Sequence, residues 1–409
     1  MNHREDSLKT RFSKELREAS VPLLEASTHP PEFYTSKDFY QLEVERIFLK
    51  EWLCVARWDE VEKPGDFLTI NLLGEPLIVA RNEANQIQAF SAVCLHRGME
   101  VVEGRGNQKS FQCRYHGWTY SLEGKLIGAP EMDKTKRFER SAHRLPCVKV
   151  EEWEGFIFVN FDLNATSLKT QLAPLSEYLK NYGLSQMKET KTVVYECNFN
   201  WKLMVENYME FYHVTTLHAG PHDFMPAQLS TTDDYNGKWE ISHGRITEPG
   251  SNFYSGDGSA SPFPPIAALT EDQRLLGDFI LVYPTHLFTV MPDSMFYYQV
   301  LPSGYDKITL RMHICFPAET MKLPTFDAAM KQAWESLLFI NDADMAACAS
   351  VQKGWSSRSA RAGRYCWLDK VLWNFNCYIR SKVLGDHLDS TARPQTKSRS
   401  KEVGKSTQG

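Results

Sequence analysis

This sequence is best understood from two short stretches, Cys94-Leu95-His96-Arg97-Gly98 and Cys113-Arg114-Tyr115-His116-Gly117-Trp118. The first has the pattern Cys-x-His and the second has the pattern Cys-x2-His, with sixteen residues between His96 and Cys113. A glycine follows each histidine, and glycine accepts the backbone conformations that a tight loop around a metal requires. The two stretches together offer two thiolates and two imidazoles as metal ligands.

Two thiolates and two imidazoles form the ligand set of a Rieske [2Fe-2S] centre, in which Cys94 and Cys113 bind one iron and His96 and His116 bind the other. Neutral imidazoles leave less negative charge on the cluster than thiolates do, so the cluster accepts an electron at a higher potential. A structural zinc site is the alternative, but such sites usually open with a Cys-x2-4-Cys knuckle, which neither stretch supplies. The pattern therefore predicts a protein that transfers single electrons.

A second group of polar residues lies between Asn200 and His218. On a continuous α-helix, Glu206, Glu210 and His213 would share one face. The alternative interpretation is an amphipathic helix with a solvated acidic face.

Two histidines of this segment, His213 and His218, are five residues apart. An ideal helix separates such residues by about 140° in azimuth, so they can share one metal only if the helix ends or bulges between them. Gly220-Pro221 follows almost at once, and both residue types terminate helices. The sequence therefore allows a shared metal site at this point.

Both cysteine-histidine stretches resemble the cluster-binding loops of Rieske non-haem iron oxygenases, the large subunits of ring-hydroxylating and related enzymes. The segment from Glu206 to His218 resembles the catalytic-iron motif of the same family, which implies that His213 and His218 bind a mononuclear Fe(II). The third ligand in the family is an aspartate eight residues before Gln-x-Gly, a place that Asp344 occupies here and for which Asp342 is the neighbouring rival. Two histidines and one carboxylate leave open positions for O2 and substrate.

The resemblance implies a catalytic role for Glu210, since a carboxylate one turn before His213 can accept the free ring N–H of that ligand. In the family this acid also reaches a cluster histidine of a neighbouring subunit, which implies a ring-shaped homotrimer. Many relatives carry Asp here, with one more residue between the asparagine and the acid. Asn207 belongs to the same motif, and an asparagine that only caps local backbone is the alternative.

The resemblance covers most of residues 35–385 and implies an α+β fold, with an N-terminal Rieske β domain and a C-terminal helix-grip catalytic domain built on an antiparallel sheet. We expect an N-terminal helical segment (1–49), the Rieske domain (50–163), the catalytic domain (164–388) and a disordered tail (389–409). Hydrophobic spacing predicts a helix over 37–53. Composition predicts a surface loop over 250–265.

The implied function is that of a terminal oxygenase, which uses O2 and electrons from NAD(P)H to hydroxylate a small organic substrate. The electrons would arrive through a flavin- and iron-sulfur-containing reductase or a ferredoxin. The substrate is either an aromatic compound or a quaternary ammonium compound such as carnitine or betaine, and the Glu-Asn-Tyr-x-Glu-x-Tyr-His form of the motif resembles the latter branch more. A Rieske electron carrier is the alternative function, and a zinc hydrolase is a weaker one because His-Glu-x-x-His is absent.

Composition and charge restrict the class of protein. The formal net charge of -5 gives no basic balance for nucleic-acid binding. No apolar run reaches the 18 residues of a membrane span, and the first residues lack the apolar core of a signal peptide. Nine cysteines without a dense framework fit a reducing compartment. We therefore expect a cytoplasmic protein without a membrane or nucleic-acid partner.

Overall fold

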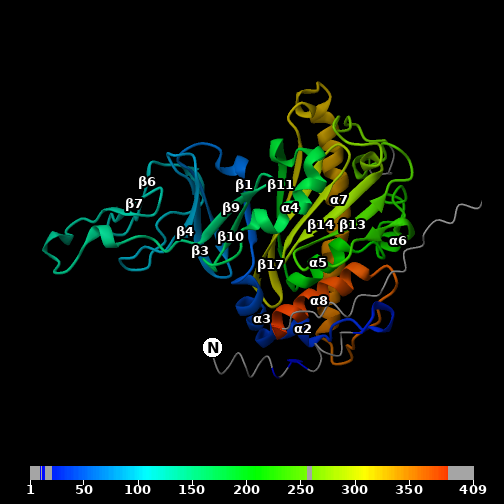
Figure 1. Ribbon diagram of the computed structural model, residues 1–409, viewed down its shortest axis with the longest axis horizontal. Coiled ribbons are helices and arrows are strands. Elements are labelled where there is room, and N and C mark those ends of the chain that lie inside the picture. Colours follow the sequence, from blue (N-terminus) through cyan, green and yellow to red (C-terminus); the bar gives the residue numbers. More distant parts are fainter. Residues whose placement is uncertain (1–9, 11, 14–20, 256–259, 386–409) are drawn as a thin grey trace, which may run out of the picture.

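The computed structural model describes residues 10, 12–13, 21–255 and 260–385 of the chain. The molecule is elongated, with small sheets at one end and a large sheet surrounded by helices at the other (Figure 1). The expected disordered tail, 389–409, lies outside the described residues. The α-helices of the described chain are α2 (Glu32–Thr35), α3 (Lys37–Glu43), α4 (Leu168–Leu179), α5 (Trp201–Met209), α6 (Val214–Leu217), α7 (Phe326–Trp355) and α8 (Lys370–Leu384).

The N-terminal part consists of three small antiparallel sheets. The first has the order β4-β3-β2-β5, with β2 (Asp66–Leu72), β3 (Glu75–Arg81), β4 (Ile87–Ser91) and β5 (Arg105–Asn107). The second has the order β6-β7-β8, with β6 (Ser110–Gln112), β7 (Thr119–Ser121) and β8 (Leu126–Gly128). The third has the order β1-β10-β9, with β1 (Leu53–Arg57), β9 (Lys149–Trp153) and β10 (Phe156–Asn160).

The C-terminal part is built on a seven-stranded sheet in the order β11-β17-β16-β15-β14-β13-β12, and every neighbouring pair is antiparallel. This confirms the expected α+β class and the antiparallel sheet. The strands are β11 (Met187–Cys197), β12 (Thr231–Thr232), β13 (Trp239–Arg245), β14 (Leu276–Val282), β15 (His286–Val290), β16 (Met295–Gly304) and β17 (Lys307–Pro317).

Both faces of this sheet are covered, which explains its continuous apolar strands. Successive side chains of a strand point to opposite faces. In β14, Ile280 and Val282 pack in one core with the leucines of α4, whereas Leu281 packs in a second core with α5, α7 and α8. The helix α5 begins at Asn200, whose side chain accepts a hydrogen bond from the Lys202 backbone N–H at 3.0 Å. The sheet thus holds α5 and α7 together on one face.

Two predicted elements differ from the structure. The helix expected over 37–53 ends with a π-helical turn at Val44–Phe48, because Leu53 begins strand β1, in which every residue is buried. The surface loop expected over 250–265 carries Phe253, Tyr254 and Phe263, which are 0–4% exposed. Its Gly, Ser and Pro content indicated a loop correctly, but these aromatic side chains anchor the segment in the core.

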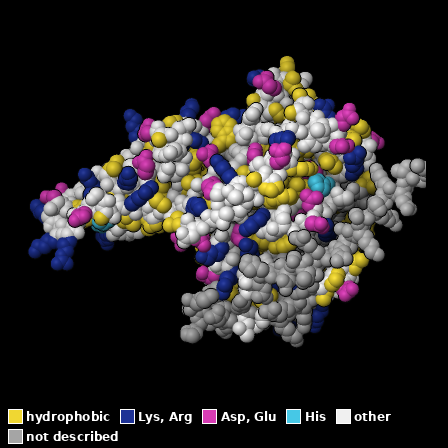
Figure 2. All heavy atoms as spheres, in the orientation of Figure 1, with side chains coloured by type: hydrophobic (Ala, Val, Ile, Leu, Met, Phe, Trp, Pro, Cys, Tyr) yellow, Lys and Arg dark blue, Asp and Glu magenta, His cyan; other side chains and the backbone are white. Residues whose placement is uncertain are grey.

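Positive and negative side chains are interspersed over the face shown in Figure 2, apart from a group of Lys and Arg at the tip of the small sheets. The part of the described surface that this view shows therefore offers no broad basic area of the kind that nucleic-acid binding requires. Among the described residues, no helix combines the length and the apolar character needed to cross a bilayer.

A buried ion pair ties the N-terminal helix α3 to α5. Lys202 Nζ lies 2.5 Å from Glu43 Oε1, and neither side chain is exposed. The indole N–H of Trp201 donates to Glu43 Oε2 at 3.1 Å. An ion pair removed from water contributes little net stability, but the loss of one partner leaves an uncompensated charge.

We therefore expect Lys202→Met to lower the free energy of unfolding by about 3–5 kcal/mol, because Glu43 would remain buried without its cation. Denaturant unfolding followed by circular dichroism measures this change. The matched control is the double variant Glu43→Gln with Lys202→Met, which should lose less than the single variant because no charge remains. An equal loss in both proteins would contradict this explanation.

Candidate functional site

The two cysteine-histidine stretches form loops of one backbone design. The first follows β4, and the second is the tip of the β6–β7 hairpin. In each loop the glycine N–H donates to the cysteine carbonyl at 3.0 Å, from Gly98 to Cys94 and from Gly117 to Cys113. Both glycines have positive φ, 77° and 70°, a conformation that side chains with a Cβ rarely adopt. The glycines that follow the histidines therefore close the two loops, as the sequence predicts.

The imidazoles of the two loops face each other. The ring centroids of His96 and His116 are 4.5 Å apart, and His96 stacks on Trp118 at 4.9 Å. The cysteines are 2–3% exposed, whereas both histidines are partly exposed. His96 Nδ1 is buried and has no hydrogen-bond partner in the described protein, as expected for a nitrogen that binds a metal. The donor set therefore fits a Rieske cluster whose histidine side is toward solvent.

The second predicted site arises where α5 ends. Met209 is the last residue of α5, Glu210 is extended with φ -97° and ψ 151°, and the short helix α6 follows. His213 and His218 flank α6 as its N-cap and C-cap residues. The expectation that Glu206, Glu210 and His213 share one helical face is therefore wrong, because the helix breaks before Glu210. This break lets both histidines turn toward one point.

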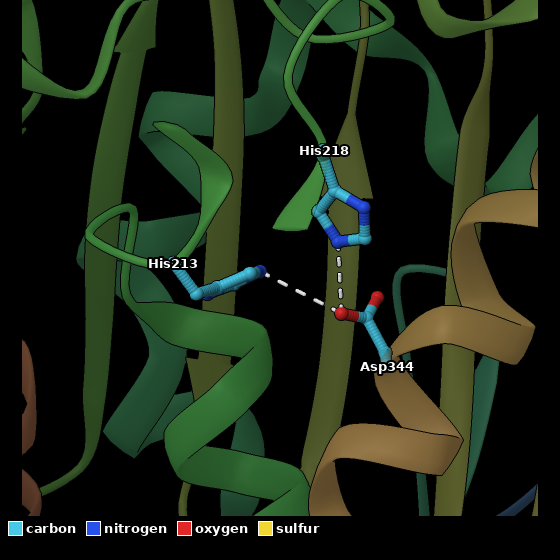
Figure 3. A group of neighbouring side chains, drawn as sticks. All are labelled: His213, His218 and Asp344. Carbon is cyan, nitrogen blue, oxygen red and sulfur yellow. Dashed lines mark hydrogen bonds and ion pairs between the residues drawn. The ribbon is translucent and has the colours of Figure 1, made fainter. Parts of the chain in front are cut away.

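Three side chains meet at that point. His218 Nε2 lies 2.9 Å and His213 Nε2 lies 3.6 Å from Asp344 Oδ1 (Figure 3). One potential ligand atom from each residue lies within 4.8 Å of the other two. Asp344 comes from α7, whereas its rival Asp342 is exposed and accepts a hydrogen bond from the Tyr195 hydroxyl at 3.2 Å. The structure thus brings Asp344, and not Asp342, to the two histidines.

Two further predicted residues support this trio. Glu210 Oε1 lies 2.6 Å from His213 Nδ1, and Glu210 Oε2 accepts the His213 backbone N–H at 3.0 Å. Burial lowers the pKa of His213, but the Glu210 carboxylate outweighs it and raises that pKa overall. Asn207 donates to Asp344 Oδ1 at 3.3 Å, so its side chain bonds to the trio and not to local backbone. Glu210 and Asn207 thus orient one histidine and the carboxylate.

Glu206 lies apart from the trio. Its carboxylate accepts a hydrogen bond from the Tyr34 hydroxyl at 2.7 Å. Burial raises the pKa of Glu206 to about 7, against the opposing effects of Tyr34 and Lys202. It belongs to the buried polar contacts between the N-terminal segment and α5.

A cavity opens beside the trio, with an empty volume of about 520 Å³ including its opening to solvent. Six aromatic rings line it, from Tyr208, Phe211, Phe253, Phe279, Phe296 and Tyr298. The hydroxyls of Tyr208 and Tyr298 pair with Thr289 and Asn341, so these side chains present mainly their rings. The wall next to the candidate metal site is therefore mainly apolar.

His222 and Phe253 also line the cavity, and sequence reasoning did not single them out. Phe253 lies in the segment expected to be a surface loop. His222 follows His218 by four residues, and this spacing is the sequence signal that could have found it.

Comparison with known proteins identifies the two parts of the chain. Residues 51–139 match the Rieske [2Fe-2S] domain, and residues 184–385 match the catalytic domain of the ring-hydroxylating alpha subunit. The second match is to a catalytic domain, so the alternative of an electron carrier without its own chemistry is wrong. The domain boundaries that we expect after residues 49 and 163 stay predictions.

Relatives and solved structures agree with these matches. The carnitine monooxygenase oxygenase subunit of Acinetobacter pittii is 33% identical over 351 residues, which cover 84% of this chain and 90% of that protein. The chloroplastic choline monooxygenase of Arabidopsis thaliana is 28% identical, with 89% of this chain and 84% of that protein covered. A solved quaternary ammonium Rieske monooxygenase, studied for carnitine oxidation by gut microbiota and inter-subunit electron transfer, superposes with a TM-score of 0.77 at 27% identity, with 90% of this chain and 98% of that chain covered.

These similarities extend over both parts of the chain and agree with the donor sets of its two candidate metal sites. Members of this family are oxidoreductases that hold a [2Fe-2S] cluster and a mononuclear non-haem iron and receive electrons from a partner reductase. The chain belongs to the Rieske non-haem iron oxygenases, the family of the ring-hydroxylating alpha subunits.

Proposed function

We propose that this oxygenase hydroxylates a small quaternary ammonium compound at a carbon bound to the cationic nitrogen. The net change is insertion of one oxygen atom of O2 into a C–H bond, while two electrons from NAD(P)H and two protons convert the other atom to water. In the hydroxylated product the C–N bond then breaks. The nitrogen leaves with the bonding electron pair as a tertiary amine, the hydroxyl proton is released, and the carbon becomes a carbonyl group. The observation that carries this proposal is the cavity of six aromatic rings beside the trio of His213, His218 and Asp344.

A wall of aromatic rings can bind a cation even though the rings carry no net charge. The faces of Phe and Tyr rings attract quaternary ammonium groups, and this attraction strengthens when water is excluded. The carboxylates of Glu210 and Asp344 are the acidic groups among the described residues of the wall, and both already bond to histidines. The rings are therefore the groups that remain to bind the cation. Carnitine and choline, which the names of the relatives give as substrates, both carry a trimethylammonium group.

The proposal assigns the metal ligands as follows. Two imidazoles and one carboxylate are the ligands of non-haem Fe(II) oxygenases, which supports His213, His218 and Asp344 as the iron site. The iron supplies reductive O2 activation when it is bound. Glu210 orients His213, and Asn207 orients Asp344. The cluster is assigned to the four residues of the two loops, Cys94, His96, Cys113 and His116.

The proposal includes a homotrimer in which the cluster of one subunit serves the iron of the next. The hairpin of β6 and β7 lies at one end of the molecule, far from α6 and α7 (Figure 1). Electron tunnelling weakens steeply with distance, which favours transfer between chains over transfer within one. A flavin- and iron-sulfur-containing reductase or a ferredoxin would deliver the electrons, and we propose a cytoplasmic location.

A substrate comparison with a surrogate reductase tests this function. We expect hydroxylated or demethylated product from a trimethylammonium compound, whereas its neutral tert-butyl analogue should bind about three- to thirtyfold more weakly, because cation–π attraction is lost. Product must be measured by mass spectrometry, since uncoupled turnover also consumes O2.

The matched variant is Phe279→Leu, which keeps an apolar wall but removes a ring that packs 5.0 Å from Phe211. This variant should bind the cationic compound more weakly, whereas its affinity for the neutral analogue should be nearly unchanged. Product from monocyclic aromatics, with none from any trimethylammonium compound, would contradict the proposal in favour of ring hydroxylation.

A further inference from the structure

One polar side chain of the cavity has no hydrogen-bond partner within the described protein. His222 is 7% exposed, and both of its ring nitrogens are buried and unpaired. The other polar side chains of the described wall each have a partner: Asn207, Tyr208, Glu210, His213, His218, Tyr298 and Asp344. A buried polar group without a partner destabilises the folded protein, so such a group calls for an explanation.

The position of His222 is fixed by its backbone. Its N–H donates to the His218 carbonyl at 3.2 Å, and its own carbonyl accepts from the Met225 N–H at 2.9 Å. The imidazole centroid lies 4.9 Å from that of His218 and 4.5 Å from the Phe253 ring. The side chain therefore lies between the proposed iron ligands and the aromatic wall, where a substrate must pass or bind.

We infer that His222 determines substrate specificity by hydrogen-bonding an oxygen substituent of the substrate, either a hydroxyl or a carboxylate. This inference rests on the proposed function, because the remainder of the substrate is the cation held by the aromatic rings. It narrows the substrate class to quaternary ammonium compounds that also carry an oxygen atom.

The unpaired imidazole of His222 favours a substrate that carries an oxygen atom. An imidazole carries at least one N–H donor in either protonation state, and a hydroxyl or carboxylate oxygen is its natural acceptor. A purely apolar substrate would seal the imidazole from water and leave its nitrogens unpaired. Sites built to hydrogen-bond a substrate oxygen discriminate strongly against analogues that lack it. His222 is separate from the trio of closely spaced ligand atoms, so its replacement should leave the metal ligands intact.

Two pairs of matched compounds test the inference on the iron-loaded holoenzyme. The hydroxyl pair is choline and propyltrimethylammonium, and the carboxylate pair is trimethylammonium butyrate and butyltrimethylammonium. We would measure kcat and KM from product, and binding by calorimetry with O2 excluded. The proteins are wild type, His222→Phe and His222→Gln, with iron content determined for each.

We expect His222→Phe to lower kcat/KM about ten- to a hundredfold for the oxygen-bearing member of one pair, mainly through KM, and less than about threefold for its partner compound. His222→Gln keeps a donor and an acceptor and should recover most of the loss. The pair in which kcat/KM changes shows whether His222 hydrogen-bonds a hydroxyl or a carboxylate of the substrate. His222→Leu removes the same hydrogen bonds and gives the same comparison if the phenylalanine variant does not fold.

Equal losses for both members of each pair, or no loss, would overturn the inference. A failure of the proposed function is visible separately, because wild type would then oxidise no trimethylammonium compound. In that case toluene and benzyl alcohol form the matched pair, and an unchanged preference in His222→Phe would again overturn the role of His222.

Discussion

Asp344→Ala is expected to abolish product formation, by roughly a thousandfold or more, while the Rieske cluster remains intact. Asp344 is the carboxylate that α7 brings to within 2.9 Å of His218 and 3.6 Å of His213. Without it, two imidazoles alone would hold the iron weakly. Iron content should fall from about three atoms per chain to about two, because the cluster retains both of its own.

The matched control is Asp342→Ala, which removes an equal charge from the same helix. Asp342 is exposed and bonds to Tyr195, so its loss should leave iron content and activity nearly unchanged. The absorption and electron paramagnetic resonance of the cluster report its integrity in both variants. Three irons per chain in Asp344→Ala, or iron loss in Asp342→Ala, would show that the third ligand is assigned wrongly.

The candidate metal ligands could be picked out from the sequence because metal-binding chemistry restricts their residue types and spacing. Cys-x-His and Cys-x2-His are rare patterns, and the glycines after them have the positive φ that the loops need. Asp344 depended on a resemblance, since nothing local separates it from Asp342 on a helix where both are acidic. The packing of α7 in the same core as α5 turns Asp344, and not Asp342, toward the histidines.

What could not be predicted depended on contacts that neither helical periodicity nor local composition shows. The continuous helix expected through Glu210 ends at Met209. The Glu210 carboxylate accepts the backbone N–H of His213, and a separate helix, α6, begins after His213. Phe253 was assigned to a surface loop from local composition, although its ring packs against Phe279 and Phe296 from two strands. Hydrophobic periodicity and composition indicate the local structure of a segment, but they do not show which other segments pack against it.

The broken helix changes the expectation for Glu210. In a continuous helix its carboxylate would accept only the ring N–H of His213, which would leave its second oxygen open to other partners. Here both oxygens face His213, one at the ring nitrogen and one at the backbone N–H. The side chain of Glu210 is 13% exposed, so a small part of it faces solvent. Orientation of the ligand and coupling of the two metal sites can therefore belong to the same residue.

Glu210→Ala is expected to retain both metals, when loaded with excess Fe(II), and to lose product formation by about a hundredfold or more. This loss is expected if Glu210 couples the reduced cluster to the iron, because the variant removes that link. Stopped-flow oxidation of the reduced cluster, in the presence of substrate and O2, should slow by a similar factor. Glu210→Gln keeps the shape and one acceptor but not the charge, so an intermediate rate is expected.

Iron titration separates the two roles of Glu210. If the carboxylate only orients His213, the alanine variant should bind iron about ten- to a hundredfold more weakly and recover full turnover once iron saturates the site. If it couples the two centres, iron saturation restores the metal but not the rate of cluster oxidation. Full recovery of that rate would disprove coupling through Glu210, whereas an unrestored rate with full iron occupancy would support the carboxylate as the link between the two metal centres.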